Sequence, residues 1–278
     1  MAKKHGSEYP TEEILESACD LDQRSVAEVL ALIHEEDGRA HAAVAEVLPQ
    51  MEAAVEVLTT VVAGGGRWFN VGAGTSGRLG VLDASEIPPT YGMSPRSVQA
   101  VIAGGDRALR HAVEGAEDDP KAAIFELQER GLEMGDAVVA LSASGRTPFV
   151  LGAVEAAHEV GARSIGITCD PRSALAESVE IAIAPQVGPE VVAGSTRMKG
   201  GLAQKMVLAA LSTAVMVKLG RVRGNLMTHV TPVSSKLRGR AVRIVMALAG
   251  VDRSEARRLL RETDGCVETA LNLSRRVG

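Results

Sequence analysis

Two segments of the chain combine small residues with hydroxyl side chains in a pattern that can hold a phosphate group. They are VGAGTSGRLGVL, residues 71–82, and LSASGRTPFVL, residues 141–151. Each indicates a strand, a turn containing Ser-Gly-Arg and the start of a helix. A phosphate at such a turn would accept hydrogen bonds from the hydroxyls and from the free amides of the helix N-terminus. The candidate ligands are Thr75, Ser76, Ser142, Ser144 and Thr147.

The first segment also carries the Gly-x-Gly-x-x-Gly spacing of a dinucleotide-binding loop. That interpretation needs an acidic residue at the end of the next strand, whereas the strand predicted at 98–103 runs into Gly104-Gly105-Asp106. Plain N-capping of the helix by the hydroxyls is a further alternative. Two equivalent turns, in a chain without a Walker-A lysine motif, favour a sugar phosphate over a nucleotide.

A third polar loop, GPEVVAGSTRMKGGLAQKM at residues 188–206, precedes a nearly uncharged helix. It adds Ser195, Thr196 and Arg197 to the candidate substrate contacts. Arg197 or Lys199 could neutralise a phosphate or carboxylate, although solvated charges at a helix start would give the same pattern.

Two groups of carboxylates could supply an acid and a base. In the first, Asp83 and Glu86 come at the end of a helix predicted over 77–85, which Pro88-Pro89 should terminate. One short element would then hold the phosphate and present Glu86. The second group is the acidic run HAVEGAEDD, residues 111–119, which is equally compatible with a solvated face. One carboxylate from each group would allow acid–base chemistry without a metal.

These groups require a sheet that brings loop residues together. Short apolar runs alternate with helix-length segments, which is typical of a parallel sheet built from β-α-β units. The predicted strands are residues 68–71, 98–103, 137–141, 164–168 and 181–184, and the predicted intervening helices are residues 77–85, 107–113, 120–130, 148–160 and 174–178. Open α/β sheets bind ligands at the carboxyl ends of their strands.

Helices are predicted on both sides of this region. A capping box at Ser25-x-x-Glu28 starts a helix that Asp37-Gly38 should stop, and a second helix covers about 44–62. A buried helix at about 200–219 suggests a subunit or domain interface. The tail is predicted to be helical over 234–249, 254–263 and 266–276. The fold class is therefore an α/β three-layer α/β/α sandwich, divided into an N-terminal helical segment (1–50), a sugar-phosphate-binding domain (51–220) and a C-terminal helical region (221–278).

Composition excludes several classes of partner. Aromatic residues make up 2% of the 278 residues and the net charge is −5, so base stacking and attraction to nucleic acid are not expected. The N-terminus lacks an apolar signal core, and the apolar run between Lys205 and Lys218 is shorter than a membrane span. A cytoplasmic protein without membrane contact is expected. The three cysteines show no paired spacing and are expected to be buried.

Several longer motifs carry a resemblance to a known family. Through them the chain resembles the N-acetylmuramic acid 6-phosphate etherases, which contain a sugar isomerase (SIS) domain. The motifs extend from about Asp37 to Lys236 and are GAGTSGRLGVLDASEIPPTYG, AGGDRALRHAVEGAEDD, SASGRTPFVLG, GPEVVAGSTRMKGGLAQK and GRVRGNLM.

The resemblance implies a dimeric parallel α/β sandwich that cleaves the D-lactyl ether of N-acetylmuramate 6-phosphate during cell-wall recycling, with no cofactor or metal. It places the two catalytic glutamates at Glu86 and Glu117, with Glu117 as the C2 base and Glu86 as the acid. Glu86 would need burial to stay protonated. The implied substrate contacts are Thr75, Ser76, Ser142, Ser144, Thr147, Ser195, Thr196 and Arg197.

Two other functions share much of this pattern. The glucokinase regulatory proteins resemble the chain in their SIS architecture but bind sugar phosphates to control a partner. A sugar-phosphate isomerase would also move a C2 proton but needs no leaving-group acid.

Overall fold

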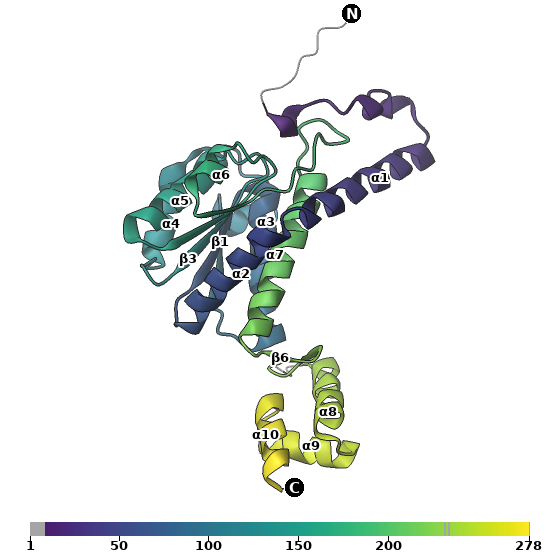
Figure 1. Cartoon of the computed structure of the whole chain (residues 1–278), viewed down its shortest axis with the longest axis vertical. Coiled ribbons are helices and arrows are strands. Elements are labelled where there is room, and N and C mark those ends of the chain that lie inside the picture. Colours follow the sequence, from purple (N-terminus) through teal and green to yellow (C-terminus); the bar gives the residue numbers. More distant parts are fainter. Residues whose placement is uncertain (1–8, 231, 233, 278) are drawn as a thin grey trace, which may run out of the picture.

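A five-stranded parallel sheet forms the centre of the computed structural model, which describes residues 9–230, 232 and 234–277 (Figure 1). The strand order is β2-β1-β3-β4-β5, so the direction of the chain across the sheet reverses between β1 and β3. The strands are β1 (Trp68–Gly72), β2 (Val98–Ile102), β3 (Ala137–Leu141), β4 (Arg163–Ile167) and β5 (Ile181–Ile183). All five predicted strands are confirmed, within one residue at each end.

Helices cover both faces of the sheet, as the predicted sandwich requires. One layer consists of α4 (Pro120–Glu129), α5 (Pro148–Val160) and α6 (Ala174–Ser178). The other consists of α2 (Leu48–Ala63), α3 (Gly74–Tyr91) and α7 (Lys199–Lys218), with α1 (Val26–Ala45) packed on α7.

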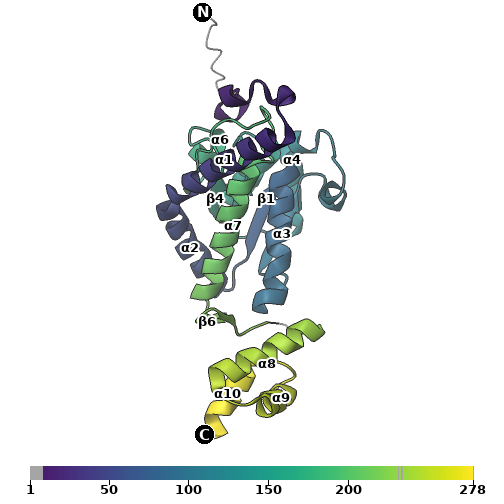
Figure 2. The same ribbon diagram turned by 90° about the vertical axis from the view of Figure 1, so that its right-hand side faces the viewer.

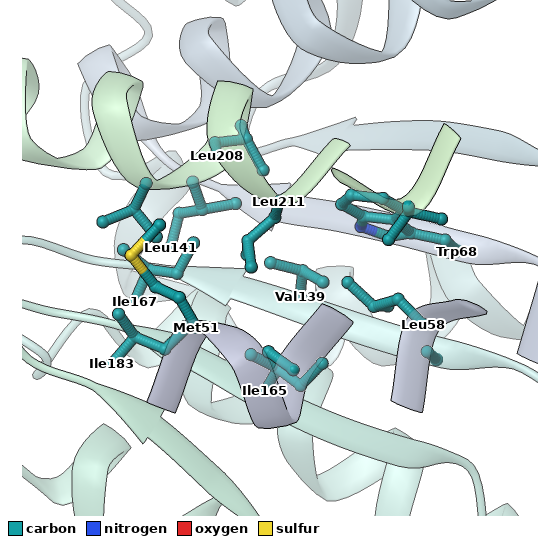
Figure 3. Close-up of a cluster of buried hydrophobic side chains, with 14 of the residues drawn as sticks. Met51, Leu58, Trp68, Val139, Leu141, Ile165, Ile167, Ile183, Leu208 and Leu211 are labelled. Atoms are coloured by element: carbon teal, nitrogen blue, oxygen red, sulfur yellow. The ribbon is translucent and has the colours of Figure 1, made fainter. Parts of the chain in front are cut away.

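Side chains point alternately to the two faces of the sheet, and they fill the interface with the helices on each face. Trp68, Val139 and Leu141 pack with α2 and α7 in one cluster, which Figure 3 shows. Phe69, Val138 and their neighbours pack with α4 and α5 in another cluster. Successive side chains of a strand point to opposite faces, so a sheet buried on both faces needs apolar residues at nearly every position.

The first two helices differ from the expectation at the end of the first and at the start of the second. Ser25 and Glu28 form the predicted capping box, but α1 continues through Gly38 to Ala45. A glycine inside a helix costs only about 1 kcal/mol, and packing of α1 on α7 outweighs that cost. Helix α2 begins at Leu48, so Pro49 occupies its first turn.

The prediction that Pro88-Pro89 ends the helix after Glu86 is wrong. Helix α3 runs through both prolines to Tyr91 and ends at Gly92, whose φ of 63° provides a left-handed cap. Proline has a φ suited to a helix, and it removes hydrogen bonds rather than forbidding the conformation. Ile87, which is 2% exposed, anchors this last part of α3 in the core.

The segment between β2 and α4 is less helical than expected. In place of a helix at 107–113 it contains two short 3-10 helices, η4 (Gly105–Leu109) and η5 (Ala116–Asp118). The N-terminal segment likewise forms three such turns, η1 (Pro10–Glu12), η2 (Glu16–Ala18) and η3 (Leu21–Gln23).

The C-terminal helices form a separate small bundle at the end of the molecule opposite the N-terminal segment (Figure 2). A two-stranded ribbon of β6 (Val222–Arg223) and β7 (Leu226–Met227) precedes it. The bundle comprises α8 (Ser235–Ala249), α9 (Arg253–Glu262) and α10 (Val267–Val277), with its own hydrophobic core. The three predicted tail helices are confirmed, but Asp252 rather than Ser254 caps α9.

Helix α7 is long and apolar enough to cross a membrane by length and composition. In the fold it is a core helix, packed against α1, α2 and α3.

Of the cysteines, Cys169 is buried, and its burial raises the pKa of the thiol to about 12. Cys19 and Cys266 are exposed, contrary to expectation, because both lie in short segments outside the sheet.

Candidate functional site

The two Ser-Gly-Arg turns meet at one cavity of about 350 Å³ at the carboxyl end of the sheet. Gly72 of β1 lies opposite Leu141 of β3, so the two turns leave the sheet at the same level. Six of the predicted contact residues line the cavity: Thr75, Ser76, Ser142, Ser144, Thr147 and Thr196. The expected convergence of the two turns is therefore confirmed.

Both helix N-termini at this cavity lack a side-chain cap within the part of the chain that the structure describes. The N-cap of α3 is Ala73, and the N-cap of α5 is Thr147, whose hydroxyl is not used for capping. Uncapped helix N-termini leave backbone N–H groups free and attract negative charge. This argues against plain N-capping and for an anion site.

Close packing explains most of the dinucleotide-like glycine pattern. A Cβ added to Gly77 would lie 2.6 Å from the Gly72 oxygen, so these two glycines let α3 approach β1. Nothing in this contact requires a pyrophosphate, which agrees with the sugar-phosphate interpretation.

Hydrogen bonds hold the second turn in shape. The Ser142 Oγ lies 2.9 Å from the Thr147 Oγ1 and 3.3 Å from the Ser144 Oγ, and it accepts a bond from the Gly145 N–H. Ser142 is 3% exposed. The three hydroxyls therefore act as one preorganised group.

Ser76 has a second structural role. Its Oγ donates a 2.8 Å hydrogen bond to the Gln204 Oε1 of α7. The hydroxyl proton is used in that bond. Ser76 can therefore offer an anion its backbone N–H, which lies in the first turn of α3.

Glu117 lies in η5 and lines the cavity together with Asp118. The preceding Gly115 has a φ of 72°, which turns the chain back toward α5. Asp119 accepts hydrogen bonds from the Lys121 and Ala122 amides and so caps α4. The structure thus distinguishes acids that the sequence pattern leaves equivalent.

Glu86 does not line the cavity that contains Glu117. It is exposed and lines a different cavity of about 340 Å³ between α3 and α7. It lies twelve positions after Gly74 along α3, which corresponds to about 18 Å at 1.5 Å per residue. Within one chain, α3 therefore cannot both hold the phosphate and present Glu86 to the same sugar, and Glu86 is not buried as the resemblance implies.

Asp83, one turn before Glu86, is a partly buried acid that lines the second cavity. Its Oδ1 accepts a 2.8 Å hydrogen bond from the Ser212 Oγ. The Oδ2 is buried without a hydrogen-bond partner among the described residues. Burial raises the pKa of Asp83 to about 6, against the opposing effect of the Ser212 hydrogen bond.

The third loop contributes one of its three candidates. Thr196 lines the cavity, whereas Ser195 and the exposed Arg197 do not. The Glu190 carboxylate, which is 1% exposed, accepts bonds from the Lys199 and Gly200 amides. Glu190 thereby caps α7 and fixes the loop that carries Thr196.

Two charged cavity residues are absent from the sequence-based candidates. Glu12 comes from the N-terminal segment, which no local pattern connects to the site. Arg146 belongs to the second copy of Ser-Gly-Arg, at the position that Arg78 occupies in the first copy. This repetition is the sequence signal that points to Arg146.

The fold and the site define a SIS-domain protein. Residues 124–214 match the SIS domain, and residues 45–158 match the glucokinase regulatory protein N-terminal SIS domain. Among solved structures, a phosphoheptose isomerase from Francisella tularensis aligns with a TM-score of 0.56 at 18% identity, covering 70% of this chain and 100% of that one. The Neisseria gonorrhoeae phosphoheptose isomerase gives 0.51 at 21% identity, covering 71% and 100%. These likenesses establish the fold.

More similar sequences identify the family. The chain is 47% identical over 255 residues to the N-acetylmuramic acid 6-phosphate etherase of Escherichia coli O6:K15:H31 (strain 536), covering 92% of this chain and 86% of that protein. It is 49% identical over 251 residues to the etherase of Pectobacterium atrosepticum (strain SCRI 1043), covering 90% and 83%. The chain belongs to the N-acetylmuramic acid 6-phosphate etherase family.

Proposed function

We propose that the protein cleaves the D-lactyl ether of N-acetylmuramate 6-phosphate to N-acetylglucosamine 6-phosphate and D-lactate. The observation that carries this proposal is the near-complete alignment with etherases at 47–49% identity. The cavity supports it, because two uncapped helix N-termini and a hydroxyl cluster suit a phosphate. We also propose that the reaction takes place in the cytoplasm as part of cell-wall sugar recycling.

The reaction needs one base and one acid. In the ring-opened sugar the C2 proton lies next to the C1 aldehyde and is acidic enough for a carboxylate to remove. Glu117 takes this proton, a C2–C3 double bond forms, and the C3–O bond breaks. Glu86 protonates the departing lactate oxygen and then activates water, whose hydroxyl adds to C3 while C2 regains a proton.

We infer that the acid comes from a second subunit. The separation of about 18 Å along α3 is several times the span of a sugar carbon chain. Leu82, one turn before Glu86 on α3, is 49% exposed, and Val217, near the end of α7, is 47% exposed. A two-fold axis beside α3 and α7 would cover this apolar face and bring the far end of one α3 to the cavity of the other subunit. Glu86 would become buried there.

The test is release of D-lactate from N-acetylmuramate 6-phosphate by the purified protein. We expect Glu86→Gln and Glu117→Gln each to lower kcat by at least about 100-fold, the usual scale of general acid–base catalysis. Glu114→Gln is the matched control, because Glu114 belongs to the same acidic run but does not line the cavity.

The competing functions give different results in the same assay. Exchange of the C2 proton with solvent, without lactate, would indicate an isomerase. Tight binding with neither exchange nor lactate would indicate a sugar-phosphate sensor, the function class of the glucokinase regulatory proteins. Either result would overturn the proposal.

A further inference from the structure

Arg146 is a charged group of the cavity to which the reaction scheme assigns no role. It lies between Ser144 and Thr147 in the second turn and lines the cavity with them. The acids Glu12, Glu117 and Asp118 also line this cavity. Among the described residues of the lining, Arg146 alone carries a positive charge.

Its guanidinium group is held from two sides. The Nη2 donates a 3.2 Å hydrogen bond to the Oδ2 of Asp170, which is 2% exposed. The Tyr9 ring stacks on the guanidinium, with its centroid 4.0 Å from Cζ. A buried carboxylate on one side and an aromatic face on the other restrict the rotamers of a long side chain.

One donor of this group is unused. The Arg146 Nε is buried and has no hydrogen-bond partner within residues 9–230, 232 and 234–277. An unpaired buried donor is destabilising, and a hydrogen-bond acceptor on a substrate would relieve that cost. Because the Asp170 contact uses Nη2, the Nε–H remains free for an acceptor that the substrate supplies.

The proposed substrate carries two anionic groups, a phosphate at C6 and a carboxylate on the lactyl ether at C3. The phosphate has its own donors in the amides and hydroxyls of the two turns. The carboxylate would otherwise face Glu117 and Asp118, which repel it. A cation in the cavity wall offsets this repulsion.

We propose that Arg146 binds the lactyl carboxylate and is therefore the residue that distinguishes the ether substrate from sugar phosphates without an acidic substituent. This inference rests on the proposed function. Asp170 and Tyr9 are positioning residues, which hold the guanidinium beside the cavity before the substrate enters.

The experiment compares two ligands on the same variants. For Arg146→Met we expect the KM for N-acetylmuramate 6-phosphate to rise by about 10- to 100-fold, the usual effect of losing one charge-assisted hydrogen bond. The Kd of N-acetylglucosamine 6-phosphate, which lacks the lactyl group, should change by less than about 2-fold. Arg146→Lys keeps the charge without the planar fork and should fall between wild type and Arg146→Met.

A third ligand isolates the charge. With the lactyl carboxylate converted to a carboxamide, wild type should bind more weakly, whereas Arg146→Met should bind the acid and the amide alike. Arg172→Met is the matched control, since Arg172 is exposed and does not line the cavity. Thermal melting of each variant separates loss of recognition from loss of folding.

Equal weakening of both sugar phosphates by Arg146→Met would assign Arg146 to the phosphate and overturn the proposal. An unchanged KM for the ether would overturn it as well. Failure of the proposed function is a separate outcome, because wild-type protein would then release no D-lactate at all.

Discussion

Lys199 and Glu36 form an ion pair in which both side chains are 1% exposed. Lys199 is the first residue of α7, and Glu36 lies in the middle of α1, so the pair joins two helices 163 residues apart in sequence. The Arg39 Nε lies 3.3 Å from the other Glu36 oxygen, close enough for charge attraction but outside hydrogen-bond geometry. The pair fixes the start of α7 directly after the loop that carries Thr196.

Breaking this pair should destabilise the protein. Lys199→Met leaves the Glu36 carboxylate buried with Arg39 as its remaining counter-charge, and we expect a loss of about 3 kcal/mol in the free energy of unfolding. Lys199→Met combined with Glu36→Leu should recover most of that loss, since no charge is then left buried. Urea unfolding measures both. A single variant as stable as wild type would contradict the interpretation.

Asp83 should make stability depend on pH. Its pKa is raised by burial from 3.8 to about 6, so the native state binds the proton more tightly than the unfolded state. The favourable contribution is fully present below about pH 4 and is lost as pH rises through about 6. The change amounts to roughly 3 kcal/mol. Asp83→Asn keeps a hydrogen-bond acceptor for Ser212. This variant should reduce the pH dependence of the free energy of unfolding between pH 4 and 6. A slope unchanged in that variant would assign the dependence to other groups.

The second turn depends on Gly145. Its φ is +66°, and an added Cβ would lie 2.1 Å from the Ser173 Oγ. Gly145→Ala should therefore cost about 3 kcal/mol from left-handed strain and overpacking together, and it should raise KM for the sugar phosphate. Gly131→Ala is the control: Gly131 has a φ of +69° but no atom within 4 Å, so only the conformational cost of about 1 kcal/mol should appear in thermal melting. Equal losses in the two variants would rule out the contact with Ser173.

Mixing two inactive variants tests whether each site is shared between subunits. A dimer of one Glu86→Gln subunit and one Glu117→Gln subunit contains one site with both glutamates intact, if they act across the interface. Random assembly on co-expression should then restore about one quarter of wild-type activity. Two differently tagged copies of Glu86→Gln provide the control and should stay inactive. No recovery in purified mixed dimers would place both glutamates in one chain.

Much of the fold follows from local patterns. The strands are largely buried and mainly apolar, and for this reason all five are located within one residue. The errors occur where packing outweighs a local signal. Gly38 and Pro88 both break helices in isolation, yet α1 and α3 pass through them because their apolar faces are already packed against the core.

The sequence by itself determined the residue types of the site: two hydroxyl-rich turns, an acidic run and the motifs that carry the family resemblance. Only the tertiary structure decided which of these residues share a cavity. It selected Thr196 over Ser195, added Arg146 and Glu12, and separated Glu86 from Glu117. The physical reason is that chemistry depends on distances across the fold, and the 1.5 Å rise of a helix separates residues that short sequence spacing makes look adjacent.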